Sequence, residues 1–297
     1  MRSIAIPLPK LFSWPLMLAH IGRSDRELLQ QVVKEQVYRA ILLEGQWHLV
    51  RVWAEGNVLH TDSLLSDLSP DQTKALQAWI RIWLGLEQDL EGFYALAASD
   101  SLLKPLLEPL SGFRVGGIPD LFEALGWTVL GQQINLAFAY TLKARLVQTY
   151  GTELSDPQSG ITCWGWPDPE GIAALDPEVL RPLSISRAKS RALVACAEAI
   201  ASGQLSRAQL VELQDAGAQE AALIKLKGIG PWSAQYVMLR CLQQPQAFPA
   251  GDAGLQNNVK RLLGLEAKPD AKTLREMATQ WQPFQGLAAG YIWQAPA

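Results

Sequence analysis

The sequence has little cysteine: Cys163, Cys196 and Cys241 are the only three in 297 residues. They lie far apart and form no C-x-x-C pair, which argues against a disulfide framework and against a zinc or iron–sulfur motif. We therefore expect no metal site, and a reducing compartment, the cytoplasm. The apolar N-terminus is broken by prolines and lacks a small-residue cleavage site, so we interpret it as folded structure rather than a signal peptide.

The sequence also lacks long apolar runs and an excess of positive charge. No apolar run reaches the roughly 18 residues that a membrane span needs, and 48% hydrophobic with 19% charged residues suits a soluble globular protein. The net charge of −3 argues against a nucleic-acid partner. Residues 1–110 carry 10 Lys and Arg against 13 Asp and Glu, whereas residues 111–297 carry 16 of each. The second part can therefore hold a local basic patch.

Strand signals are confined to residues 1–110. Three runs rich in β-branched and aromatic residues are predicted as strands: 37–43, 47–53 and 58–61. A helix is predicted to open at Pro70, since proline suits the first helical turn. The spacing of Ser24 and Glu27 is that of a capping box and predicts another helix over 24–35.

The strand signal disappears in the second part of the chain, where helical periodicity replaces it. Asp120, with Glu123 three residues later, predicts a capped helix start. The Pro-, Gly- and Asp-rich stretch 155–171 predicts a long loop. Further helices are predicted near 136–150, 187–201, 207–213, 218–226, 231–243, 253–263 and 271–280. The predicted fold is an α+β domain over 1–110 followed by an all-α region over 111–297.

The stretch LKGIGPWSAQYV, residues 226–237, places two glycines and a proline at the entrance of a predicted helix. Gly228 and Gly230 permit a left-handed backbone or close approach by another molecule, and Pro231 suits the first helical position. Backbone N–H groups at such an entrance can hold a phosphate, which the helix dipole favours. The stretch is equally consistent with a phosphate-binding helix-hairpin-helix motif and with a tight turn between helices.

Two aromatic residues and one carboxylate follow the hairpin. Trp232 and Tyr236 lie four residues apart, so they share one helix face. Such pairs belong to a core more often than to a binding surface, although a base taken out of a duplex needs aromatic walls. Asp252 precedes a predicted helix and, taken alone, is predicted as its N-cap. A cap can also be a catalytic group, because capping fixes the direction of the carboxylate.

Together these features resemble the helix-hairpin-helix DNA glycosylases, specifically the DNA-3-methyladenine glycosylase II (AlkA) type. The resemblance covers most of residues 111–297, where it implies two helical lobes, and is weaker in the N-terminal part. Its motifs are Phe122-Glu123-Ala124 leading to Gly131-Gln132-Gln133, Leu226 to Val237, Phe248-Pro249 followed by Asp252, and Trp281-Gln282-Pro283-Phe284 running to Tyr291-Ile292-Trp293. The hairpin together with an aspartate at this spacing is the most specific of them.

The resemblance implies a chemical role for four residues. Asp252 would be the catalytic carboxylate, which stabilises the positive charge that builds on the sugar when an N-glycosidic bond is cleaved. Trp232, Tyr236 and Trp293 match the pocket positions of the family, where aromatic rings attract cationic alkylated bases. Glycosylases that also cut the DNA backbone carry a lysine in the region of Trp232. Tryptophan there implies a monofunctional enzyme without a Schiff base.

The resemblance also implies DNA contacts outside the pocket. Gly228, Ile229 and Gly230 would hold a backbone phosphate. Gln132 and Gln133 would lie at the DNA, with Gln133 in the gap left by the flipped nucleotide, where the family often has an apolar wedge. The alternative for the two glutamines is a polar junction between helices.

His20 is the one candidate in the N-terminal part. The resemblance would bring it near the pocket wall, at a place where the family has an aromatic hydrocarbon ring. The alternative is a surface histidine on a helix.

The function implied is a monofunctional DNA glycosylase that hydrolyses the N-glycosidic bond of alkylated purines, such as 3-methyladenine, in duplex DNA during base excision repair. We expect a monomer that binds no membrane and no cofactor, although the resemblance allows a monovalent cation at the hairpin. One alternative is a helix-hairpin-helix DNA-binding protein without chemistry. Another keeps the hairpin as a purely structural turn.

Overall fold

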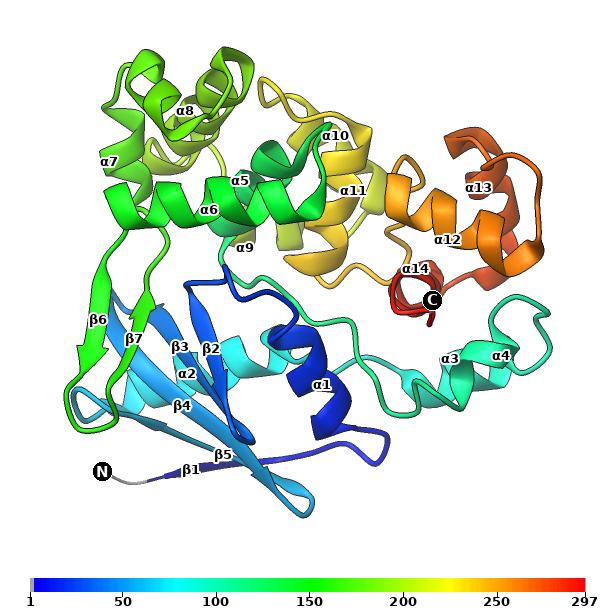
Figure 1. Ribbon diagram of the computed structural model, residues 1–297, viewed down its shortest axis with the longest axis horizontal. Coiled ribbons are helices and arrows are strands. Elements are labelled where there is room, and N and C mark those ends of the chain that lie inside the picture. Colours follow the sequence, from blue (N-terminus) through cyan, green and yellow to red (C-terminus); the bar gives the residue numbers. More distant parts are fainter. Residues whose placement is uncertain (1–2, 297) are drawn as a thin grey trace. The chain divides into compact units, whose positions relative to one another are not determined.

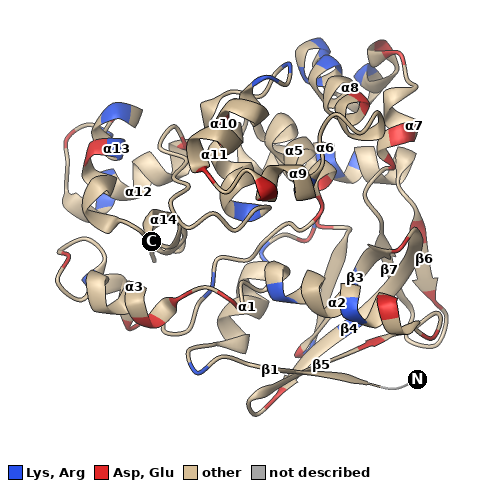
Figure 2. Cartoon of the chain, turned by 180° about the vertical axis from the view of Figure 1, so that it is seen from behind, with Lys and Arg blue, Asp and Glu red and all other residues tan. Residues whose placement is uncertain are grey.

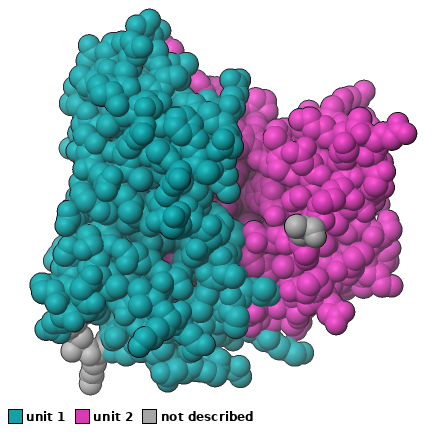
Figure 3. Space-filling view, viewed as in Figure 1, with its two compact units in different colours: residues 1–10, 14–81, 126–204 teal, residues 11–13, 82–125, 205–297 magenta. Residues whose placement is uncertain are grey.

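The computed structural model of the chain describes residues 3–296 and divides into two compact units (Figure 3). Unit 1 is made of residues 1–10, 14–81 and 126–204, and unit 2 of residues 11–13, 82–125 and 205–297. Each unit draws on both parts of the sequence, so the units run across the boundary that the sequence predicts at residue 110. The domain division into 1–110 and 111–297 stays a prediction.

Unit 1 contains a five-stranded antiparallel sheet with the strand order β1-β5-β4-β3-β2 (Figure 1). Its strands are β1 (Ile4–Pro7), β2 (Gln30–Val33), β3 (Gln36–Leu43), β4 (Gln46–Glu55) and β5 (Val58–Ser63). The three predicted strands are confirmed as β3, β4 and β5. Glu44 and Gly45 join β3 to β4 at positive φ angles of 47° and 77°, the geometry of a two-residue hairpin turn.

Among its described residues, unit 1 also contains six helical elements. They are α1 (Trp14–Ile21), α2 (Pro70–Trp83), α6 (Leu136–Tyr150), α7 (Pro169–Ala173), a 3-10 helix (Pro177–Leu183) and α8 (Arg187–Ala201), and α5 (Leu121–Gly131) leads from unit 2 into unit 1. Local signals explain their ends: the Asn135 side chain accepts from the Phe138 N–H at 2.9 Å and starts α6, and Gly151 ends it. The helix predicted to open at Pro70 is confirmed as α2.

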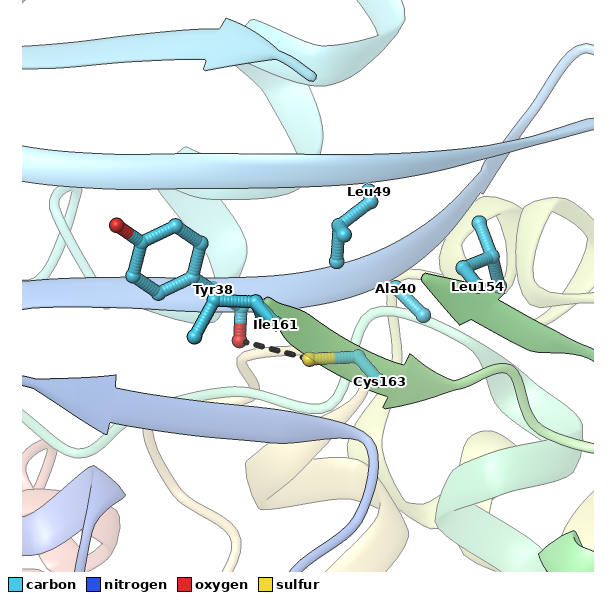
Figure 4. Packing of buried hydrophobic residues seen from close by; sticks show 6 residues of the cluster. All are labelled: Tyr38, Ala40, Leu49, Leu154, Ile161 and Cys163. Atoms are coloured by element: carbon cyan, nitrogen blue, oxygen red, sulfur yellow. Dashed lines mark hydrogen bonds between the residues drawn. The ribbon is translucent and has the colours of Figure 1, made fainter. Parts of the chain in front are cut away.

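A β-hairpin occupies part of the stretch predicted as a loop over 155–171. Its strands are β6 (Glu153–Asp156) and β7 (Ile161–Trp164). Side chains from both strands pack with side chains of the five-stranded sheet in one buried cluster (Figure 4): Tyr38, Ala40, Leu49, Leu154, Ile161 and Cys163. The loop prediction is wrong for these residues, because four-residue strands show too short a pattern and are stabilised by the sheet against which they pack.

The helix predicted over 24–35 is also wrong. Ser24 begins a turn, and residues 30–33 form strand β2. The Glu27 carboxylate, which a capping box would direct back to the backbone near Ser24, instead accepts from Lys143 Nζ at 2.8 Å and from the Leu29 N–H at 3.0 Å. Both charged side chains of this ion pair are more than nine-tenths buried. A long-range pairing therefore decides the conformation of this segment.

Unit 2 is helical. Its helices are α3 (Leu90–Ala97), α4 (Lys104–Leu107), α9 (Arg207–Glu212), α10 (Ala216–Ile224), α11 (Pro231–Arg240), α12 (Ala253–Leu263), α13 (Ala271–Ala278), a 3-10 helix (Thr279–Trp281) and α14 (Gln285–Trp293). The helices predicted between 207 and 280 are thereby confirmed within a few residues at each end. The fold class is also confirmed: an N-terminal antiparallel sheet is followed by a helical chain, with the β6–β7 hairpin as an addition.

Buried aromatic side chains fix the position of α14. Tyr291 is fully buried, and its ring centroid lies 4.8 Å from that of Phe93 in α3. The Tyr291 and Tyr94 hydroxyls are 2.9 Å apart, and Tyr291 also donates to the Phe113 carbonyl at 3.0 Å. Just before α14, Trp281 donates its indole N–H to Asp100 at 2.8 Å. These contacts hold the helix that ends at the candidate site residue Trp293.

Neither a metal centre nor a membrane span is found among residues 3–296. Within that range no three His, Cys, Asp or Glu residues lie together as metal ligands would, and no helix is long and apolar enough to cross a membrane. Cys163, Cys196 and Cys241 are all buried and unbridged. Burial raises the pKa of each thiol to about 12, so the thiols are protonated at neutral pH.

Charged residues are spread along the chain. Figure 2 shows Lys and Arg on several helices, α8 and α13 among them, with Asp and Glu in between. The distribution of charge therefore does not single out one binding face on the chain.

Candidate active site

The hairpin between α10 and α11 is built from two glycines in different conformations. Gly228 has a φ of +86°, which favours glycine, whereas Gly230 is extended with φ −101° and ψ −179°. A Cβ atom added to Gly230 would meet nothing within 4 Å. Ile229 between them is 4% exposed, and its N–H donates to the Leu226 carbonyl at 3.1 Å. Gly228 and Ile229 therefore shape the turn, and Gly230 leaves its outer side open.

The first turn of α11 has no side-chain cap. Gly230 is its N-cap residue and Pro231 its first helical residue, so neither supplies a side-chain acceptor. The neighbouring helices α12 and α13 are capped by Asp252 and Asp270. An uncapped helix start with open space beside it suits an external anion. The carbonyl oxygens of the hairpin are also the donor type that a monovalent cation uses, so the cation that the resemblance allows is chemically compatible.

Asp252 is held by three donors. It is the N-cap of α12, as the sequence predicts, and its Oδ1 accepts from the Leu255 N–H at 2.8 Å. Oδ1 also accepts from the Trp293 indole N–H at 3.0 Å, and Oδ2 accepts from the Trp232 indole N–H at 3.1 Å. The carboxylate is half-buried. Its two oxygens are thus fixed in direction while part of the group stays accessible.

The two tryptophans that contact this carboxylate both lie next to a tyrosine ring. Trp232 and Tyr236 come from the first two turns of α11, and Trp293 is the last residue of α14. Neighbouring ring centroids are 5.9 Å apart for Trp232 and Tyr236 and 6.0 Å apart for Tyr236 and Trp293. Tyr236 is 8% exposed, whereas both tryptophans are half-buried. The fold therefore brings together four residues that the sequence motifs single out. Both tryptophans keep part of their side chains accessible to solvent.

A cavity of about 450 Å³ lies next to Trp232. Trp232 and Gly251 line it together with residues of α13 and the start of α14, including Arg275 and Gln285. Its lining does not include Asp252, Tyr236 or Trp293. Trp232 therefore both lines this cavity and donates to the carboxylate of Asp252.

Two residues that the sequence motifs do not single out support the site. Asn258 donates its side-chain amide to the Ile292 carbonyl at 2.9 Å, which ties α12, capped by Asp252, to the end of α14. Arg240, the last residue of α11, donates to the Tyr236 hydroxyl at 3.0 Å. Asn258 lies 34 residues from Ile292, so no local pattern predicts that contact. Arg240 follows Tyr236 by 4 residues, a spacing at which two side chains of one helix meet, so a helical pattern could have indicated this contact.

The other candidates, Gln132, Gln133 and His20, belong to unit 1. The two glutamines form the junction between α5 and α6, where Gln133 is exposed and has a φ of +56°. A non-glycine residue in the left-handed region is uncommon and marks a sharp junction. Lys189 braces this junction by donating to the Leu130 carbonyl at 2.6 Å. A role of either glutamine at DNA stays a prediction.

His20 lies in the last turn of α1 and is half-buried. Its Nε2 lies 2.8 Å from Arg23 Nη1, and the same guanidinium donates to the His20 carbonyl at 2.7 Å. Because a guanidinium only donates, Nε2 of His20 is the acceptor in this pair, which requires a neutral imidazole. A place for His20 at the pocket stays a prediction.

Comparison with known proteins decides the family. Residues 127–283 match the model of the HhH-GPD superfamily base excision DNA repair proteins. This range contains the hairpin, Trp232, Tyr236 and Asp252. The chain belongs to this superfamily. The helix-hairpin-helix resemblance drawn from the sequence motifs is thereby confirmed.

Similar proteins extend the match over nearly the whole chain. The sequence is 38% identical to the DNA-3-methyladenine glycosylase of Bacillus subtilis (strain 168), covering 98% of this chain and 96% of that protein. It is 31% identical to DNA-3-methyladenine glycosylase 2 of Escherichia coli (strain K12), covering 61% and 60%. The solved structure of the 3-methyladenine DNA-glycosylase from Archaeoglobus fulgidus has the same fold, with a TM-score of 0.85 at 24% identity over 98% of this chain and 97% of that chain.

Proposed function

We propose that the chain is a monofunctional DNA glycosylase that hydrolyses the N-glycosidic bond of alkylated purines, such as 3-methyladenine, in duplex DNA. The observation that supports this best is the carboxylate of Asp252, held by the indoles of Trp232 and Trp293 within a group of aromatic rings. Similarity to proteins named DNA-3-methyladenine glycosylases over nearly the full chain supports the substrate class. The enzyme would act as a monomer in the cytoplasm.

The chemistry follows from the residues present. As the bond from the sugar to the base breaks, positive charge builds on the sugar, and the nearby carboxylate of Asp252 stabilises it. Water adds to the sugar and completes the hydrolysis. The rings of Trp232, Tyr236 and Trp293 would stack on a flipped base and attract a cationic one. The uncapped start of α11 at Gly230 would hold a DNA phosphate.

The decisive experiment compares base release from alkylated duplex DNA by the wild type and by Asp252→Asn. Asparagine is also a good N-cap, so this substitution preserves the start of α12 while it removes the charge. Asp270→Asn is the matched control, because Asp270 caps α13 in the same way, accepting from the Thr273 N–H at 2.8 Å. We expect no release by Asp252→Asn above the rate without enzyme, and wild-type release by Asp270→Asn. Base release by Asp252→Asn at the rate of Asp270→Asn would contradict the assignment of Asp252 as the catalytic carboxylate.

The same reaction separates the alternatives. A binding protein without chemistry would retain distorted DNA yet release no base even as wild type. The monofunctional assignment predicts abasic sites that stay uncut until alkali is added, and no covalent protein–DNA adduct after borohydride reduction. An adduct trapped by borohydride would contradict it.

A further inference from the structure

Helix α12 contacts the end of α14 through two of its side chains. Asn258 donates its side-chain amide to the Ile292 carbonyl at 2.9 Å, and Arg261 Nη2 donates to the Ala295 carbonyl at 3.2 Å. The two donors are three residues apart in one helix, so they lie on the same face of α12. Both acceptors lie at the C-terminal end of α14, where a helix leaves carbonyls available to outside donors. These two bonds hold the backbone on either side of Trp293.

Trp293 lies at the part of α14 that most needs such support. The middle of the helix is fixed by the fully buried Tyr291, which donates to the Phe113 carbonyl at 3.0 Å. Trp293 is the last helical residue and is half-buried, and helix ends open more readily than helix centres. Asn258 holds the carbonyl directly before Trp293 and is half-buried, whereas Arg261 is exposed. Asn258 is therefore the better shielded of the two supports.

Asn258 and Asp252 belong to the same helix, so the contacts close a ring. Asp252 caps the start of α12, and Asn258 lies in the second turn of that helix. Trp293, at the end of α14, donates its indole N–H to Oδ1 of Asp252 at 3.0 Å. One helix thus carries both the carboxylate that accepts from the indole and the amide that holds the backbone next to the indole. Movement of the end of α14 away from α12 would lengthen the bond between indole and carboxylate.

We propose that Asn258 is a positioning residue of the active site: by holding the Ile292 carbonyl, it keeps the Trp293 indole N–H on the Asp252 carboxylate. This inference rests on the proposed function, in which Asp252 is the catalytic carboxylate. A carboxylate whose direction is fixed before the reaction lowers the barrier of the chemical step. Asn258 acts through Trp293, so it affects the rate of bond cleavage and not the affinity for DNA.

The test is the single-turnover rate of base release from alkylated duplex at saturating DNA. Asn258→Leu removes the donor and keeps a side chain of the same branched shape, and we expect it to lower the rate about three- to tenfold with DNA affinity within about twofold of the wild type. Asn257→Leu is the matched control and should keep the wild-type rate. Asn257 is exposed, and its side chain makes no hydrogen bond among residues 3–296. Asn258→Gln keeps the amide donor and should retain more of the rate than Asn258→Leu.

A double-mutant cycle shows through which residue Asn258 acts. The indole N–H is absent from Trp293→Phe, so adding Asn258→Leu to that variant should lower its rate by less than about 1.5-fold. An equal loss in the wild-type and Trp293→Phe backgrounds would overturn the proposal, because a merely structural role is additive. A wild-type rate in Asn258→Leu would overturn it as well. If Asn258→Leu does not fold, Asn258→Asp, which replaces the donor by an acceptor, decides by the same criteria.

A measurement without DNA tests the positioning independently of base release. In NMR spectra of protein with isotope-labelled tryptophan, hydrogen exchange of the Trp293 indole N–H should be severalfold faster in Asn258→Leu than in the wild type, and unchanged in Asn257→Leu. Unchanged exchange in Asn258→Leu overturns this inference and leaves the proposed function standing. Faster exchange in a protein whose wild type releases no base contradicts the proposed function, and with it the effect of Asn258 on the rate.

Discussion

Trp293 donates its indole N–H to Oδ1 of Asp252 at 3.0 Å, across 41 residues of sequence. Trp232 approaches the other oxygen from a different helix at 3.1 Å. The carboxylate is therefore oriented by two tryptophans that also form part of the aromatic group. Under the proposed function each tryptophan would serve two purposes: its N–H group would orient the carboxylate, and the face of its ring would stack on the base.

Trp293→Phe separates these two purposes, because phenylalanine keeps an aromatic face and loses the N–H donor. A hydrogen bond to a charged acceptor is worth about 1.5–3 kcal/mol, so we expect the single-turnover rate on alkylated duplex to fall about tenfold or more. DNA binding should change little. Trp281→Phe is the matched control, since the fully buried Trp281 donates in the same way to Asp100 at 2.8 Å. The control should lower the free energy of unfolding and leave the rate of the folded enzyme unchanged. A wild-type rate in Trp293→Phe would contradict the orienting role.

The two hairpin glycines should respond differently to substitution. Gly228→Ala forces a side chain into a backbone with φ +86° and should lower the free energy of unfolding by about 1–2 kcal/mol. Gly230→Asp meets open space and supplies a good N-cap, so the protein should be at least as stable as the wild type. Its charge would repel a phosphate, so DNA affinity should fall and the salt dependence of binding should lose about one phosphate contact.

The control for the hairpin is Gly230→Ser, which caps α11 without charge and should bind DNA better than Gly230→Asp. Urea unfolding and DNA titrations at several salt concentrations check these expectations. Unchanged DNA binding by a folded Gly230→Asp would favour the purely structural turn.

The buried pair of Glu27 and Lys143 should contribute to stability in a pH-dependent way. Burial by itself raises the pKa of Glu27, but the charge and hydrogen bond of Lys143 at 2.8 Å hold that pKa below its usual value. A lowered pKa in the folded state stabilises the fold at any pH above the pKa of Glu27 in the unfolded chain, near 4.3. This stabilisation is lost as the pH falls through the pKa of Glu27 in the folded state. The free energy of unfolding of the wild type should therefore fall below about pH 4.

Lys143→Met leaves the Glu27 carboxylate buried without this partner and should lower the free energy of unfolding at pH 7 by about 3 kcal/mol or more. We expect burial to raise the pKa of Glu27 in that variant, so the free energy of unfolding of the variant should rise as the pH falls from 7 to 5. The contribution of this pair in the wild type should stay level over the same range. Adding Glu27→Gln to the Lys143→Met variant should restore much of the lost free energy of unfolding, since it removes the buried negative charge. Chemical denaturation at pH 7 and pH 5 measures all three proteins. This account would be contradicted if the free energy of unfolding changed with pH in the same way in the wild type and in Lys143→Met.

Local signals account for much of what the sequence predicts correctly. The cap of α12 at Asp252, the proline at the start of α11 and the glycine after α6 each act within one helical turn. The strands β3 to β5 follow one another with short turns, so their pattern is readable in order. The wrong predictions, a helix over 24–35 and a loop over 155–171, lie where distant partners override the local signal.

By itself the sequence determined the strands β3 to β5, most of the helices after residue 120, the hairpin and the set of candidate residues, since these depend on neighbours within a few positions. Only the tertiary structure decided that both Asp252 oxygens accept from indoles, that Arg240 contacts Tyr236 and Gly116, and that Glu27 pairs with Lys143. Those pairings, up to 124 residues apart, form where buried polar groups must find partners, and no short-range pattern encodes which partner packing brings within reach.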